Sequence, residues 1–128
     1  MGANYATALE TALAMTCDGR TPFLVQEFVP GDGGYGVGAL CGKGRVRATF
    51  AFRRLHEYPT TGGASTLRVG IEHPAMIAAA TRLLEAMEWD GVAMVEFKLD
   101  ARDGRPMLIE VNGRFWGSLA LAVRSGVD

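Results

Sequence analysis

The sequence predicts an α+β fold, with a mostly antiparallel sheet of about five strands and helices packed on one face. Apolar, strand-like segments follow one another across short turns, which favours antiparallel neighbours. One segment, from Pro74 to about Glu88, instead has apolar residues at helical spacing. The chain has 128 residues, 48% of them hydrophobic and 21% charged, which suits one domain around a single core.

The predicted elements run in the order helix, three strands, helix, two strands, helix. Leu9 and Leu13, four residues apart, indicate the first helix, and a turn sequence before Pro22 ends it. Pro74 suits the first position of the second helix. The expected helices are Tyr5–Met15, Pro74–Glu88 and Trp116–Arg124, and the expected strands are Phe23–Val29, Tyr35–Cys41, Arg45–Leu55 and the two apolar stretches GVAMVEFKLD and PMLIEVNGRFW.

Two glutamates in the last two strands are the most informative residues. A hairpin centred near Asp103 places Glu96 directly opposite Glu110, and like charges at opposed positions destabilise a sheet. Asn112 shares a face with Glu110, because side chains alternate along a strand. Two carboxylates and an amide oxygen suit Mg²⁺, which binds one or two carboxylates together with substrate phosphates. A solvated sheet face would explain Glu96 alone, but for the three residues together we favour a metal site.

Two glycine-rich segments are weaker signals. Residues 31–36 formally satisfy GxGxxG, but a strand rather than a helix follows them, so we expect a hairpin connection that needs positive φ. Residues 60–65, TTGGAS, expose backbone N–H groups that can bind an anion, and Arg68 follows them; a flexible surface loop would look the same. Arg114, two residues beyond Asn112, is placed either to meet a phosphate or oxyanion or to form a surface salt bridge.

Composition argues against several classes of function. The net charge is −1, a balance that gives no support to nucleic-acid binding, which normally shows a basic stripe or patch. No apolar run approaches the roughly 20 residues that span a bilayer, and the N-terminus does not resemble a signal peptide. Cys17 and Cys41 show no metal-type spacing and indicate reduced thiols. His56 and His73 have no metal-like or triad-like partner, so we expect each to be a structural or a solvated histidine. A cytoplasmic protein fits best.

Four stretches together resemble the ATP-grasp superfamily. They are VQEFVPGDG, RLHEYPTTGGAS, GVAMVEFKLD and LIEVNGRFWGS, and they look most like the carbamoyl-phosphate-synthase-like branch and related carboxylate–amine ligases. The resemblance runs from about Phe23 to the end, and only as the C-terminal lobe. It implies that residues 1–128 form a single partial domain, without the N-terminal lobe and the domain before it.

The resemblance also implies a role for each matching residue. Glu96, Glu110 and Asn112 would hold Mg²⁺ (or Mn²⁺) at the ATP phosphates. The hinge segment would contact adenine, and Asp32 would contact the ribose. Arg114 would stabilise the acyl phosphate, and Arg68 with the TTGGAS loop would face the carboxylate substrate. The hinge residues are Gln26, Glu27, Phe28 and Val29.

These roles imply the Mg–ATP-binding portion of an ATP-dependent carboxylate–amine (or thiol) ligase that acts through an acyl phosphate. Its ligands would be ATP and a small carboxylate. The isolated chain is expected to be inactive, because the resemblance lacks the lysines and glycine-rich loop of the other lobe. The surface left by that lobe is expected to favour self-association. A non-catalytic ATP-grasp-like binding or assembly module is the alternative.

Overall fold

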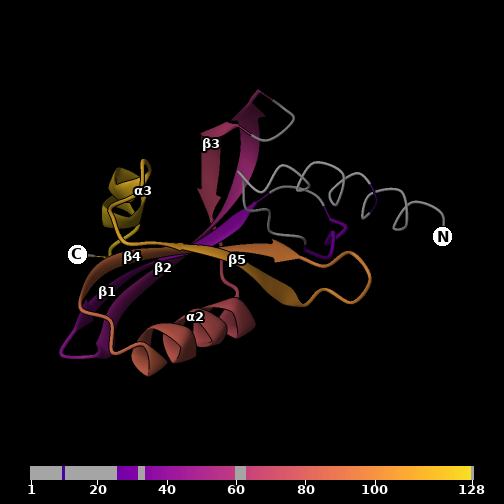
Figure 1. Cartoon of the computed structure of the whole chain (residues 1–128). Helices are drawn as coiled ribbons and strands as arrows, with labels where there is room; N and C mark the ends of the chain where they lie inside the picture. The colour runs from indigo at the N-terminus through magenta and orange to yellow at the C-terminus, as the bar shows by residue number, and fades with distance from the viewer. Residues whose placement is uncertain (1–9, 11–25, 32–33, 60–62, 128) are drawn as a thin grey trace, which may run out of the picture.

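Five antiparallel strands form one sheet in the part of the chain that the computed structural model describes, residues 10, 26–31, 34–59 and 63–127 (Figure 1). The strand order is β3-β2-β1-β4-β5. The sheet and two helices confirm the predicted α+β class. The strands are β1 Tyr35–Gly42, β2 Arg45–Tyr58, β3 Ala64–Gly70, β4 Gly91–Leu99 and β5 Pro106–Asn112, and the helices are α2 Pro74–Ala86 and α3 Leu119–Arg124.

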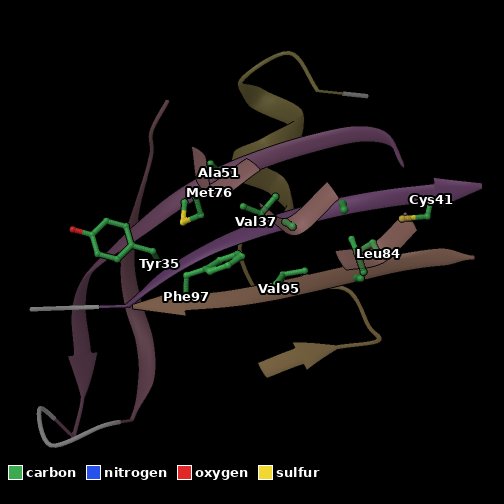
Figure 2. Close-up of a cluster of buried hydrophobic side chains, with 11 residues drawn as sticks. Tyr35, Val37, Cys41, Ala51, Met76, Leu84, Val95 and Phe97 are labelled. Atoms are coloured by element: carbon green, nitrogen blue, oxygen red, sulfur yellow. The ribbon is translucent and has the colours of Figure 1, made fainter. Parts of the chain in front are cut away.

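One face of the sheet, here called the α2 face, carries the larger part of the core (Figure 2). Strand alternation points every second residue of β1 and β4 at α2, whose stripe of buried side chains covers them. The free thiol of Cys41 is buried here, and burial raises its pKa, as do the charges of Asp90 and Glu85. The residues of this cluster include Val37, Ala39, Met76, Ala80, Leu84, Val95 and Phe97.

The opposite face, here called the α3 face, holds a second and smaller core. Trp116 and Ala122 pack there with Phe52 of β2 and Met94 of β4. The prediction that the helices share one face is therefore wrong in this respect, since α2 and α3 lie on opposite sides of the sheet (Figure 1). A helix of only six residues gives no periodicity from which its side could be read.

A row of glycines in and before β1 shapes the α3 face. A methyl group at Gly36 would overlap the ring of Phe52, and one at Gly38 would overlap the ring of Trp116. A methyl group at Gly34 would lie 2.9 Å from Cδ of Arg54. Gly31 does have positive φ, 151°, as predicted for this segment. Gly34, Gly36 and Gly38 are required instead by the close approach of large side chains.

The observed sheet differs from the prediction in two strands: one that was predicted before β1, and β3, which was not predicted. The expected strand Phe23–Val29 has no strand conformation over residues 26–29, and its first three residues lie outside the described part, as does the first helix except Glu10. The fifth strand is instead β3, which pairs only with β2. Sequence reasoning missed β3, because an edge strand exposed on most of its length lacks apolar alternation.

Tight turns connect the paired strands where they were expected. Lys43 and Gly44 have φ of 56° and 69° and close the β1–β2 hairpin, a pattern typical of a type I′ turn. The β4–β5 hairpin contains a one-residue bulge. Phe97 pairs with Leu108 but Glu96 pairs with Glu110, so Ile109 is the extra residue.

Candidate active site

The structure places the two glutamates of β4 and β5 as the sequence predicted. Glu96 pairs directly with Glu110, and Met94 pairs with Asn112, which puts all three polar side chains on the α3 face. The side-chain amide of Asn112 donates a hydrogen bond of 2.9 Å to Oε1 of Glu110. The three residues predicted as metal ligands are therefore brought together on adjacent strands.

Arg54 is the residue of this site that sequence reasoning did not assign. Its Nη2 lies 2.5 Å from Oε2 of Glu96, and the side chains are only 17% and 14% exposed. Its Nη1 also lies 3.4 Å from Oε1 of Glu57. The opposed carboxylates thus have a protein cation beside them. The signal available in the sequence was an arginine two positions beyond the buried Phe52, hence on the same face.

Arg68 and Arg114 add two more guanidinium groups to this side of the sheet. Arg68 pairs with Arg54 in the β2–β3 ladder, lies 4.7 Å from the ring centroid of Phe52 and donates to Oγ of Ser118 at 3.1 Å. Burial lowers the pKa of Arg68, and the positive charges of Arg54 and Arg114 lower it further, against an opposing effect of Glu96. Crowded cations of this kind favour an anionic ligand.

Arg114 lies beside the predicted metal ligands, where the sequence placed it. Its Nη2 donates to Oδ1 of Asn112 at 3.4 Å, and its Nη1 donates to the carbonyl of Phe115 at 3.2 Å. No salt bridge of Arg114 is found among the described residues. The arrangement leaves its charge close to Asn112 and to Arg68.

A cleft of about 250 Å³ lies between β3 and the start of α3. Arg68 and three hydroxyl groups line it, which gives both charge and hydrogen-bonding partners. Residues 60–62 of the TTGGAS loop lie outside the described part, whereas Ser65 at its end lines the cleft. The lining residues are Ser65, Thr66, Arg68, Gly117, Ser118 and Leu121.

The predicted hinge segment, residues 26–29, packs against the turn of the β4–β5 hairpin. Glu27 forms a 2.8 Å ion pair with Arg102, and Lys98 lies 4.7 Å from the ring centroid of Phe28. The carbonyl of Pro30 accepts from the amide of Ala101 at 2.8 Å. Gln26 and Phe28 are exposed and Val29 is half-buried, while Asp32 lies outside the described residues.

A buried carboxylate anchors that turn. Asp100 is 1% exposed and receives side-chain hydrogen bonds from Nε and Nη2 of Arg102, at 2.8 Å and 2.5 Å to the nearer oxygens. These bonds, with one from the backbone amide of Arg102, lower the pKa of Asp100 to about 2, while burial acts in the opposite direction. Arg102 therefore ties the buried end of β4 to the hinge residue Glu27.

The donor set fits a hard cation such as Mg²⁺. Glu96, Glu110 and Asn112 supply oxygen atoms from neighbouring positions on two strands, as an octahedral ion with some water ligands requires. No group of three or more His, Cys, Asp or Glu side chains is placed to hold a metal within the described ranges. The two histidines take no part: His73 instead caps α2, its Nδ1 accepting from the amide of Met76 at 3.2 Å.

Comparison with known protein families shows the class to which the chain belongs. A family model described as "ATP-grasp in the biosynthetic pathway with Ter operon" matches residues 20–128. The chain therefore belongs to this ATP-grasp family. No match was found among curated proteins. None of the helices within the described ranges is long and apolar enough to cross a bilayer.

Among solved structures, Rhizobium etli pyruvate carboxylase with the allosteric activator acetyl coenzyme A is similar to this chain. The TM-score is 0.62 and the sequence identity is 19%. The similarity covers 84% of this chain but 11% of that one. It is a similarity of fold, and the chain spans about a tenth of the length of that enzyme.

Proposed function

We propose that this chain is the Mg–ATP-binding C-terminal lobe of an ATP-dependent carboxylate–amine (or thiol) ligase that acts through an acyl phosphate. Membership of an ATP-grasp family supports the nucleotide-dependent, ligase-type assignment. The similarity of its fold to a part of a pyruvate carboxylase supports the assignment of the chain as one lobe. The other lobe would supply the remaining contacts to the nucleotide phosphates.

The opposition of Glu96 and Glu110 is the observation that carries this proposal. A sheet face that pairs two carboxylates and adds Asn112 beside them has the oxygen donors that a divalent cation needs. Glu96, Glu110 and Asn112 would hold Mg²⁺, which would neutralise negative charge on the phosphate groups of ATP. The three residues are fixed by strand backbone, so their relative positions do not depend on a flexible loop.

The arginines and the hydroxyl groups that line the cleft suit the second substrate. Arg68 and the hydroxyls of Ser65 and Ser118 would bind a small carboxylate in the cleft between β3 and α3. A carboxylate oxygen would form a bond to the γ-phosphorus of ATP as the bond to the β–γ bridging oxygen breaks and ADP leaves. Arg114 would stabilise the acyl phosphate, which an amine or thiol then attacks to release phosphate. Such transfer relies on positioning and charge rather than on a protein nucleophile.

The hinge segment suits the adenine. Backbone groups of Glu27 and Val29 would hydrogen-bond the edge of the base, and Asp32 would contact the ribose. The segment is held against the turn of the β4–β5 hairpin by Arg102. The β4 strand therefore connects the proposed adenine end of the site with Glu96 at its proposed phosphate end.

Substitution of Glu110 tests this function in the protein that carries the chain. Glu110→Gln keeps the shape of the side chain and removes its charge. We expect it to abolish ADP release that depends on added carboxylate and to weaken Mg–ATP binding in calorimetry by at least tenfold, about 1.4 kcal/mol. Glu72→Gln is the matched control, because Glu72 is exposed in the connection between β3 and α2.

The same experiment separates the two candidate functions. A non-catalytic binding module would bind Mg–ATP and lose that binding in Glu110→Gln, but would release no ADP with any of a panel of small carboxylates. A Glu110→Gln protein that turns over as fast as wild type would remove Glu110 from the metal site and refute the ligand assignment.

A further inference from the structure

The side chain of Arg54 lies across a neighbouring strand to reach Glu96. Arg54 belongs to β2 and Glu96 to β4, and β1 lies between these strands in the sheet. The amide of Arg54 donates to the carbonyl of Gly34 at 2.8 Å, which fixes the backbone of Arg54 beside the start of β1. Gly34 has no side chain, so the arginine passes over it; an added methyl would lie 2.9 Å from Cδ.

The contact joins two mostly buried charges. Nη2 of Arg54 is 2.5 Å from Oε2 of Glu96, and water reaches less than a fifth of either side chain. Glu110 faces Glu96 across the β4–β5 pair, so the sheet carries like charges at directly opposed positions. Arg54 is the cation that balances Glu96 here. In the metal-free protein, Arg54 therefore already balances the charge of Glu96, which is one of the proposed metal ligands.

We propose that Arg54 is a positioning residue and the resident counter-ion of Glu96: it holds this carboxylate in the metal-free protein, and a divalent cation binds by displacing the guanidinium from it. This inference rests on the proposed function, since it concerns the same metal ligands. Because one carboxylate oxygen cannot serve both cations at full strength, the ion pair lowers the affinity for metal.

Displacement has a second consequence. A guanidinium released from Glu96 remains on the α3 face beside Arg68, where an anion would be attracted to it. Binding of the cation therefore prepares the face for a phosphate or carboxylate, and by linkage the anion favours the cation. The ion pair makes metal and anion bind together rather than independently.

Calorimetric titration with MgCl₂ and with MnCl₂, in the absence of nucleotide, tests the proposal. Arg54→Met removes the resident cation and keeps most of the side-chain volume, and we expect it to bind either metal about tenfold more tightly than wild type. Arg54→Lys, which retains the charge, is expected to stay close to wild type. Arg45→Met is the matched control, because it removes the same charge from an exposed ion pair with Glu85.

Melting temperatures supply a second readout that does not depend on activity. In EDTA, Arg54→Met is expected to melt below wild type, because the opposed carboxylates then lack their counter-ion. Added Mg²⁺ is expected to raise its melting temperature by more than it raises that of wild type, as tighter binding to the folded state requires. Gly34→Ala keeps the charge but displaces Arg54, so it is expected to tighten metal binding in the same direction.

Two outcomes would overturn the proposal in different ways. Equal or weaker metal binding by Arg54→Met and by Gly34→Ala, with binding lost in Glu110→Gln, would refute the counter-ion role and leave the metal site standing. If neither wild type nor Arg54→Met binds either metal, with or without ATP, then the metal site of the proposed function fails and the counter-ion role fails with it.

Discussion

Substitution of Gly38 by alanine probes the packing that places α3 over the sheet. The added methyl would lie within 2.7 Å of three ring carbons of Trp116, which is 7% exposed and belongs to the smaller core. Either the indole ring moves or the strand does. Overpacking of this kind costs about 1–3 kcal/mol. We expect a loss of about 2 kcal/mol, or roughly 8 °C in Tm at about 4 °C per kcal/mol for a domain of this size.

Urea unfolding followed by tryptophan fluorescence and by circular dichroism measures this loss. Gly42→Ala is the matched control on the same strand, because the nearest atoms to its added methyl, in Arg47, lie at 3.8 Å. Its stability is expected to change by no more than about 0.5 kcal/mol. The double variant Gly38→Ala with Trp116→Leu is expected to lose less than the sum of the two single losses. Equal stability of Gly38→Ala and Gly42→Ala would refute the proposed contact between Trp116 and β1.

Two further predictions concern single anchors of the fold. The pKa of Asp100 is about 2 in the folded protein against about 3.9 in an unfolded chain, so its contribution to stability is complete above about pH 4 and is lost as the pH falls toward 2. Asp100→Asn should therefore flatten the fall in urea midpoint between pH 5 and pH 2.5; an unchanged slope would contradict this. His73→Ala should lose about 1 kcal/mol by removing the cap of α2, whereas His73→Asn should retain most of it, and thermal melts at pH 7.5 compare them.

The β4–β5 hairpin and α2 could be predicted from the sequence because local rules decide both. The turn near Asp103 and the alternation of side chains are sufficient to place Glu96 opposite Glu110, and the structure confirms that pair. The apolar stripe after Pro74 is long enough to define both the helix and its buried face. In both cases the information lies within about twenty consecutive residues.

The features that the sequence did not predict depend on distant parts of the chain. β3 is an edge strand held by its pairing with β2, and its composition does not distinguish it from a loop. The side of the sheet that α3 covers is decided by Trp116 packing on Gly38, residues far apart in sequence. The segment Phe23–Val29 is apolar enough to predict a strand, but the described contacts of Glu27 and Phe28 are to Arg102 and Lys98.

The candidate site divides in the same way. The carboxylates and Asn112 follow from strand alternation, and Arg114 follows from its distance from Asn112. Arg54 does not, because its partner is two strands away and the contact requires a glycine between them. The sequence predicted a cation beside Glu96, and we took that cation to be a metal ion; in the structure it is Arg54.

The bulge at Ile109 decides the side of the sheet on which Glu110 lies. In a continuous hairpin, a one-residue insertion or deletion in the turn would reverse the facing of every side chain beyond it, Glu110 included. Here the register changes between Phe97 and Glu96. The pairs next to the turn that carries Arg102 and the pairs that include Glu110 therefore differ in register by one residue. Without the bulge, the pairing of Phe97 with Leu108 would continue as Glu96 with Ile109, and Glu110 and Asn112 would lie on the α2 face.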